Sequence, residues 1–316
     1  MPKCLVCFEA LESSSSGAYH KRCAKALFES ATAPTIDLDP SGLAEAGLSL
    51  LRASGALPGV QKKLSVDRTP GEARRMTLRA LGGRYILKPP VDEYPMLAEN
   101  EAFCMELVAR LGYPTAPHGL ARLADGTLAY LSRRFDRPAD GSKLPQEDFC
   151  QLSGRPSADK YKGSLEAAAR ALRRSSQEGL DAVRFMQLNL ISWLMGNADL
   201  HLKNFSLYRP APGRWQLSPA YDLVSTALVI PEDKEETALT LNGKKARLSR
   251  ADWLSLADKL GISLKVFTNL GRRLFDAWPQ VETLCRVSFL SPAMQDDFLA
   301  RWRERADRLM AENRHG

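Results

Sequence analysis

One polar segment, set between two apolar ones, constrains the fold of this chain more than any other feature. Residues 197–208 read Asn-Ala-Asp-Leu-His-Leu-Lys-Asn-Phe-Ser-Leu-Tyr, so the segment begins with two carboxamides, a carboxylate, an imidazole and an ammonium close together. Residues 185–195 before it have the apolar spacing of a buried helix, and residues 205–208 alternate like a short strand. Because burying unpaired polar groups is costly, we expect a solvated loop that carries chemistry between a core helix and a core strand.

The spacing within this segment indicates which chemistry the loop carries. Asp199 and Asn204 are five residues apart, the interval at which protein kinases place a catalytic base and a magnesium-binding asparagine. A second metal-binding carboxylate is then expected on the next hairpin, and Asp222 follows the turn-rich residues 209–213. The sequence has no Asp-Phe-Gly triplet, so it is not an ordinary eukaryotic-type kinase. The alternative is that Asp199 and Asp222 are unrelated loop carboxylates.

These residues resemble the signature of the HipA-family serine/threonine kinases, the toxins of bacterial toxin–antitoxin operons. The likeness spans roughly residues 55 to 226. The segments that carry it are residues 59–63, 85–89, 99–101, 133–137, 144–151, 196–206 and 221–222. Because the chain is short for HipA itself, it resembles most the HipT type, in which the missing N-terminal subdomain is a separate small protein.

The resemblance implies an α+β fold, bilobal and protein-kinase-like (HipA-like), with a β-rich N-lobe and a helical C-lobe. Independently of the resemblance, the cysteine and histidine spacing described below predicts a zinc knuckle in residues 1–30. Residues 31–136 would form the kinase N-lobe with its phosphate-binding loop, and residues 137–316 the helical kinase C-lobe. A chain of 316 residues is long enough for two lobes and a sizeable core.

The resemblance also gives the polar segment its roles. Asp199 would be the catalytic base, and His201 and Lys203 would add positive charge near the transferred phosphoryl group. Asn204 and Asp222 would hold Mg²⁺ beside the phosphates of ATP.

Residues earlier in the chain are expected to bind the nucleotide. A loop of small residues at 54–59 could cradle phosphate oxygens, and a lysine ending an apolar strand could contact the phosphates, positioned by a glutamate on the next helix. The predicted nucleotide-binding residues are Gly59, Val60, Gln61, Lys63, Lys88, Glu101, Arg133 and Gln151. A plain β-turn, a lysine facing water and a solvated glutamate are the alternative interpretations.

The phosphate-binding loop departs from its family in one respect. In HipA-like kinases, phosphorylation of a serine just before the Gly-x-Gln element ejects this loop and switches the enzyme off. HipT-type members carry two serines there, separated by one residue. The corresponding positions here are Ala56 and Pro58, which have no hydroxyl. With Ser54 and Ser65 as the nearest hydroxyls, we expect weak autophosphorylation of the loop or none.

The N-terminus carries a second, independent pattern. Cys4 and Cys7 form one Cys-x2-Cys pair, and His20 and Cys23 form a second pair twelve residues further on. Three thiolates and one imidazole in such pairs suit a tetrahedral structural Zn²⁺ site. The alternative is a set of reduced core cysteines that bind no metal.

Composition limits the cellular compartment and the kinds of binding partner. No apolar run approaches the ~20 residues of a membrane span, no signal-peptide segment is evident, and the six cysteines are scattered, so we expect a cytoplasmic protein with no membrane partner. The formal net charge of +7 is too diffuse to indicate nucleic acid by itself. The resemblance implies an aminoacyl-tRNA synthetase, tryptophanyl type, as the substrate whose phosphorylation arrests translation and growth. It also implies two partners, a HipB-like DNA-binding antitoxin and a HipS-like small protein. The chain would then contact DNA only indirectly, through the antitoxin.

Two other classes of protein remain open from the sequence. One is a small-molecule kinase of the aminoglycoside or lipid type, which shares the fold and the Asp–Asn–Asp arrangement. The other is a non-enzymatic module that binds zinc and nucleic acid through the N-terminal knuckle and a basic surface. The ordered set of Asp199, Asn204 and Asp222 argues against the second class, which has no use for it.

Overall fold

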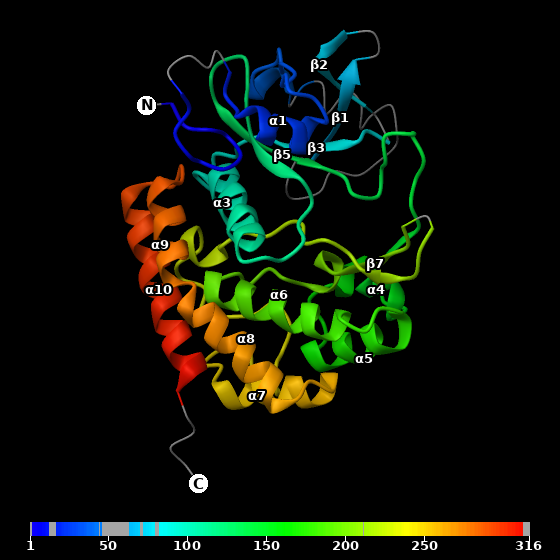
Figure 1. Ribbon diagram of the computed structural model, residues 1–316, viewed down its shortest axis with the longest axis vertical. Coiled ribbons are helices and arrows are strands. Elements are labelled where there is room, and N and C mark those ends of the chain that lie inside the picture. Colours follow the sequence, from blue (N-terminus) through cyan, green and yellow to red (C-terminus); the bar gives the residue numbers. More distant parts are fainter. Residues whose placement is uncertain are drawn as a thin grey trace. The chain divides into compact units, whose positions relative to one another are not determined.

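The computed structural model describes residues 2–12, 17–43, 45, 63–69, 72–79, 82–210 and 212–311, with the side chains of 72–74 left aside. The predicted loop residues Gly59, Val60 and Gln61 lie outside this part of the chain, as do Ala56 and Pro58. The chain divides into two compact units (Figure 1). The first comprises Met1–Glu106, Ala116–Lys143 and Val287–Leu290, and the second Leu107–Thr115, Leu144–Arg286 and Ser291–Gly316.

The first unit is built on an antiparallel sheet with the strand order β2-β1-β3-β5-β4. Its strands are β1 (Leu64–Thr69), β2 (Glu72–Leu78), β3 (Tyr85–Lys88), β4 (His118–Arg122) and β5 (Leu128–Arg133). This part includes the helices α1 (Lys21–Phe28) and α3 (Leu97–Arg110), the second of which continues into the other unit. A hairpin joins β4 to β5, and Gly126 supplies its left-handed residue with φ 89°.

Strand alternation decides where the polar side chains of this sheet point. Tyr85 and Leu87 are buried in one core cluster with Leu27 and Phe28 of α1. Successive side chains of a strand point to opposite faces, so Lys88 faces away from α1. Lys88 is nevertheless buried, and it therefore needs a partner on its own side of the sheet.

The second unit is mostly helical. Its helices are α4 (Phe149–Leu152), α5 (Leu165–Ser175), α6 (Asp181–Met195), α7 (Arg250–Leu260), α8 (Leu264–Asp276), α9 (Trp278–Val287) and α10 (Pro292–Met310). A small antiparallel sheet joins β6 (Gln146–Asp148), β7 (Ser206–Tyr208) and β8 (Gln216–Leu217) in the order β6-β7-β8. Helix α6 is buried along most of its length, and α5, α7 and α10 lie beside it. Among the described residues, no helix is long and apolar enough to cross a membrane.

Candidate active site

A required glycine turns the chain out of α6 and into the polar loop. Gly196 ends the helix in the left-handed region at φ 81°, and its N–H is hydrogen-bonded to the carbonyls of Ser192 and Trp193. A Cβ at this position would lie 2.8 Å from Cδ of Arg301 and 3.0 Å from Cβ of Ala227. Both the backbone conformation and the close approach demand glycine, so the loop leaves α6 in one fixed direction.

The loop is anchored to the segment that follows Asp222. The Ala198 N–H donates to Oγ1 of Thr226 at 2.8 Å, and that hydroxyl donates to the Gly196 carbonyl at 3.1 Å. The Asp199 N–H donates to Oδ1 of Asn197 at 2.8 Å, which forms an Asx turn. The backbone of Asp199 is therefore held from both sides, by its own loop and by the chain after Asp222. The sequence had given no role to Asn197 or Thr226.

The Asp199 carboxylate has a partner that the sequence did not reveal. The Tyr161 hydroxyl donates to Oδ1 of Asp199 at 2.5 Å. The Tyr161 ring also meets the His201 ring edge-on, with centroids 4.9 Å apart. Burial, and then the hydrogen bond to Asp199, raise the pKa of Tyr161, so the phenol remains protonated and can donate. One carboxylate oxygen of Asp199 is thus engaged by a tyrosine 38 residues earlier in the chain.

His201 is buried, and its Nδ1 has no hydrogen-bond partner within the described part of the chain. Burial lowers the pKa of His201 below its ordinary value of 6.5, although the nearby Asp199 acts in the opposite direction. Burial therefore disfavours the charged imidazole, whereas the sequence predicted positive charge at this position.

Asn204 and Asp222 meet directly. Nδ2 of Asn204 donates to the main-chain carbonyl of Asp222 at 3.0 Å, which orients the amide. Its Oδ1 is buried and, among the described residues, has no hydrogen-bond partner. Asp222 itself adopts the left-handed region at φ 60°, which aspartate tolerates better than most non-glycine residues. An unpaired carboxamide oxygen next to an aspartate fits the oxygen ligands that Mg²⁺ takes.

Lys203 and Gln151 are both engaged by Asp148, a residue that sequence reasoning missed. The Lys203 ammonium lies 2.6 Å from Oδ2 of Asp148. Asp148 caps α4: the Gln151 N–H donates to its Oδ1 at 3.0 Å, and the Asp148 N–H donates to Oε1 of Gln151 at 2.9 Å. The side chain of Gln151, predicted to bind the nucleotide, thus closes a capping box, and the Asp-x-x-Gln spacing was the signal for it.

In the first unit, Lys88 has its partner in Glu101 on α3. Its Nζ lies 2.6 Å and 2.8 Å from the two carboxylate oxygens, and the two side chains are 5% and 2% exposed. The ammonium also lies 5.4 Å from the ring centre of Tyr130 on β5. The structure therefore brings together the lysine and the glutamate that the sequence proposed as a pair.

The other predicted nucleotide-binding residues of this unit are placed differently. Lys63 is exposed directly before β1. The Arg133 guanidinium forms an ion pair with Glu29 and donates to the Ala26 carbonyl at 3.1 Å. The Arg133 side chain is thereby held at the C-terminal end of α1.

The four N-terminal residues predicted to hold zinc also converge. The ligand atoms of Cys4, Cys7, His20 and Cys23 all lie within 4.8 Å of one another. Hydrogen bonds from the thiols of Cys23 and Cys7 lower the pKa of Cys4 well below its ordinary value. The group is compatible with a zinc site.

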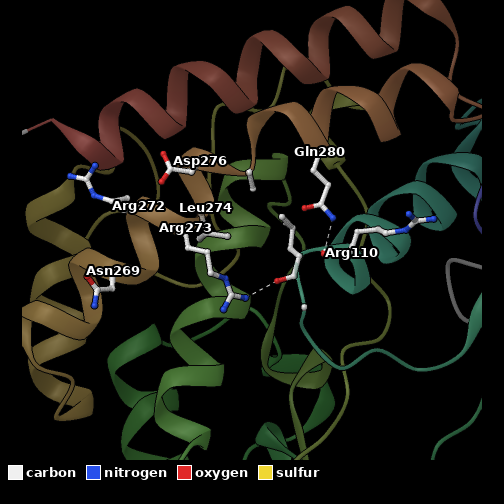
Figure 2. Close-up of a pocket in the computed structure, with 10 residues that line it drawn as sticks. Arg110, Asn269, Arg272, Arg273, Leu274, Asp276 and Gln280 are labelled. Carbon is white, nitrogen blue, oxygen red and sulfur yellow. Dashed lines mark hydrogen bonds between the residues drawn. The ribbon is translucent and has the colours of Figure 1, made fainter.

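A separate cavity of about 600 Å³ lies in the second unit (Figure 2). Arg273 donates to the Leu111 carbonyl at 2.7 Å, and Gln280 donates to the Arg110 carbonyl at 3.0 Å. These bonds satisfy carbonyls at the C-terminal end of α3, which would otherwise lack partners. The residues around the cavity are Arg110, Leu111, Gly112, Asn269, Arg272, Arg273, Leu274, Asp276, Ala277 and Gln280. None of them belongs to the Asp199 loop, and their contacts support the packing of helices.

Comparison with known sequences finds relatives over most of the chain. The family model described as HipA-like C-terminal domain matches residues 55–281. The Sinorhizobium fredii proteins named "Putative kinase Y4mE" and "Putative kinase Y4dM" are each 32% identical to the chain, over 80% and 77% of its length. A Haemophilus influenzae protein named "Putative kinase" is 29% identical over 71% of the chain and 73% of its own length. The chain spans only 65% and 62% of the two Sinorhizobium proteins.

Solved structures show the same fold. HipA of Shewanella oneidensis, solved in a complex with HipB and operator DNA, superposes with a TM-score of 0.66 and 22% identity, over 80% of this chain and 64% of that one. The Helicobacter pylori proinflammatory kinase CtkA superposes with a TM-score of 0.51 and 14% identity, over 74% of this chain and 87% of that one. The α+β, kinase-like fold predicted from the sequence is thereby confirmed.

Proposed function

The chain belongs to the family of the HipA-like C-terminal domain, as the resemblance in its sequence predicted, and from that premise we propose that it is an ATP-dependent protein serine/threonine kinase. The observation that carries the proposal is the meeting of Asn204 with Asp222, where the buried Oδ1 of Asn204 lacks a partner among the described residues. Asn204 lies in the loop that holds Asp199, and the chain after Asp222 is hydrogen-bonded to the start of that loop. The kinase names of the relatives support the same reaction class.

In this proposal the Asp199 carboxylate accepts the proton of the serine or threonine hydroxyl of the substrate. Tyr161 engages Oδ1, so the acceptor hydroxyl approaches Oδ2. Asn204 and Asp222 would hold Mg²⁺, which neutralises phosphate charge when it is bound. Lys203, paired with Asp148, keeps one positive charge in the same loop.

Lys88 would bind the phosphates of ATP, with Glu101 holding its ammonium in place. The geometry suits that role because both oxygens of Glu101 contact Nζ. An ammonium held this way loses little freedom when it binds an anion. Arg133 and Gln151 would then act through the backbone or through the packing around them, since their side chains have other partners.

We further propose that the protein is a cytoplasmic toxin whose substrate is an aminoacyl-tRNA synthetase, the tryptophanyl type being the first to test. All six cysteines are without a disulfide, which agrees with a reducing compartment. A HipB-like antitoxin is the proposed partner, and its support is the HipB and operator DNA found with the HipA relative. A HipS-like small protein is the second proposed partner, resting on the resemblance to the HipT type.

The test is phosphoryl transfer from radiolabelled ATP with Mg²⁺ to proteins of a bacterial lysate and to purified tryptophanyl-tRNA synthetase. We expect Asp199→Asn and Asp222→Asn to lower transfer by at least about 100-fold, because each removes a base or a metal ligand. Asp258→Asn is the matched control, since Asp258 is exposed on α7 of the same unit. Near-wild-type transfer by Asp199→Asn or Asp222→Asn would refute the assignment of the site.

A further inference from the structure

The N-terminal cysteines and histidine form a cluster that the proposed kinase reaction does not use. Cys4 and Cys7 lie in a turn, His20 is the residue before α1, and Cys23 is in its first turn. All three cysteines are buried and none is in a disulfide. Ligands at about 2.3 Å from a tetrahedral zinc lie roughly 3.8 Å apart, and the four ligand atoms here lie within 4.8 Å of one another. Small side-chain movements would complete such a shell.

The hydrogen bonds of His20 leave one ring nitrogen ready for a metal. Its Nε2 lies 3.1 Å from the Ala10 carbonyl, which can only accept, so Nε2 carries the proton. Nδ1 then presents its lone pair, 3.3 Å from Sγ of Cys7. Metal-bound histidines are typically oriented in this way, by a hydrogen bond from the other ring nitrogen to a carbonyl or carboxylate.

The backbone around Cys4 and Cys7 has the tight turn that a metal knuckle needs. The Phe8 N–H donates to the Cys4 carbonyl at 3.0 Å, and the Cys4 N–H donates to the Glu9 carbonyl at 2.9 Å. Phe8 itself is buried and left-handed at φ 64°, which is rare for a bulky residue. The His20 N–H also points at Sγ of Cys4, at 3.4 Å, as backbone donors do around thiolates.

We propose that Cys4, Cys7, His20 and Cys23 bind one structural zinc ion. A disulfide would use only two of the three thiols and would leave the oriented imidazole without a purpose. Zinc accepts all four groups in the geometry that they already approach. Because four protein ligands fill a tetrahedral shell, no position remains for a substrate, and the ion has a structural role.

The zinc would fix the N-terminal turn against the edge of the sheet. Strand β4 lies at one edge of the sheet order. Its Leu120 N–H donates to the Leu5 carbonyl at 2.7 Å, and its carbonyl accepts from the Tyr19 hydroxyl at 2.8 Å. A Cβ on Gly119 would lie 2.8 Å from Cγ2 of Val6, which shows how closely the turn approaches. The turn therefore covers an edge that would otherwise be open to strand pairing.

The first experiment measures zinc in the full chain purified from zinc-supplemented medium. We expect about one zinc per chain in the wild type and less than about 0.2 in Cys7→Ser and His20→Ala. Cys104→Ser is the matched control, because Cys104 is a buried cysteine of the same unit outside the cluster, and it should keep its zinc. His20→Cys should also keep zinc, since four cysteines form a zinc shell equally well. Full zinc content in Cys7→Ser and His20→Ala would overturn the assignment.

A second experiment needs only the wild-type chain, so it decides the matter even where a variant fails to fold. The metal is removed with a chelator and cobalt(II) is added. A cobalt–thiolate charge-transfer band together with intense tetrahedral d–d bands is expected, and their absence would overturn the proposal. Thermal melting then tests the structural role: the metal-free chain should melt at a lower temperature and regain its midpoint with zinc. An unchanged midpoint would overturn the role in holding the turn.

Discussion

Replacing the buried ion pair of Lys88 and Glu101 can separate structure from catalysis in the first unit. The ammonium contacts both carboxylate oxygens, at 2.6 Å and 2.8 Å, and the side chains are 5% and 2% exposed. Removing one partner leaves a buried charge uncompensated, which costs about 3–5 kcal/mol. Replacing both with apolar side chains of similar volume is often close to neutral. The two kinds of variant should therefore differ in stability.

Lys88→Met and Glu101→Leu are each expected to melt well below the wild type. With about 2–4 °C per kcal/mol for a chain of this size class, a loss of about 3–5 kcal/mol lowers the midpoint by roughly 6–20 °C. The double variant should recover most of that loss. Phosphoryl transfer should stay at least about 100-fold down in Lys88→Met and in the double variant, because methionine cannot bind phosphate. It should also fall in Glu101→Leu, because the ammonium of Lys88 is then no longer held in place.

Circular dichroism melting and transfer of radiolabelled phosphate, assayed below the lowest midpoint, measure the two properties. Arg286→Met is the matched control: its ion pair with Asp296 at 2.6 Å is exposed, so the midpoint should barely change. A double variant that regains both stability and phosphoryl transfer would show that the pair is purely structural. Single variants that melt like the wild type would show that the pair is not buried as described.

Three further predictions concern the loop and its control. Tyr161→Phe removes the hydrogen bond to Asp199 and should lower kcat by about tenfold with the KM for ATP unchanged; an unchanged kcat would show that the backbone alone orients Asp199. Burial lowers the pKa of His201 below 6.5, so the imidazole binds a proton more readily in the unfolded chain than in the folded one. The stability that His201 contributes is therefore full above pH 6.5 and is lost as the pH falls toward the folded pKa. Urea unfolding at several pH values should show this decrease in the free energy of unfolding, and His201→Asn should make it smaller. Mass spectrometry after incubation with ATP and Mg²⁺ should find little or no phosphate on the phosphate-binding loop before β1. Stoichiometric phosphate at Ser54 or Ser65, with loss of ATP binding, would show that the inhibitory phosphorylation site has moved to that serine.

The elements around the polar loop could be predicted because the side chains that they bury recur at regular intervals in the sequence. The apolar spacing before residue 197 is that of α6, and the alternation after residue 204 is that of β7. The place of Lys88 follows from the same argument, since it ends a strand whose alternate residues pack on α1. Local patterns of this kind depend on neighbours a few residues apart, so one sequence contains them in full.

Contacts between distant segments produce no such pattern in the sequence. Tyr161 and Asp199 are 38 residues apart, and Asp148 and Lys203 are 55 apart. No spacing rule connects these pairs, because the fold alone brings them together. The burial of His201, which lowers its pKa and disfavours the positive charge predicted for it, is likewise a property of the packed structure.

The sheet of the first unit connects the proposed zinc cluster to the proposed nucleotide lysine. Helix α1 carries Cys23 among its buried residues, and its Leu27 and Phe28 cover the face of β3 that Tyr85 and Leu87 occupy. With that face covered, the alternation of β3 leaves Lys88 only the opposite face, where Glu101 lies. A shift of β3 by one residue would reverse both faces and bury Lys88 under α1 without a partner. By fixing where α1 begins, the zinc shell would help to keep Lys88 on the face that its proposed role requires.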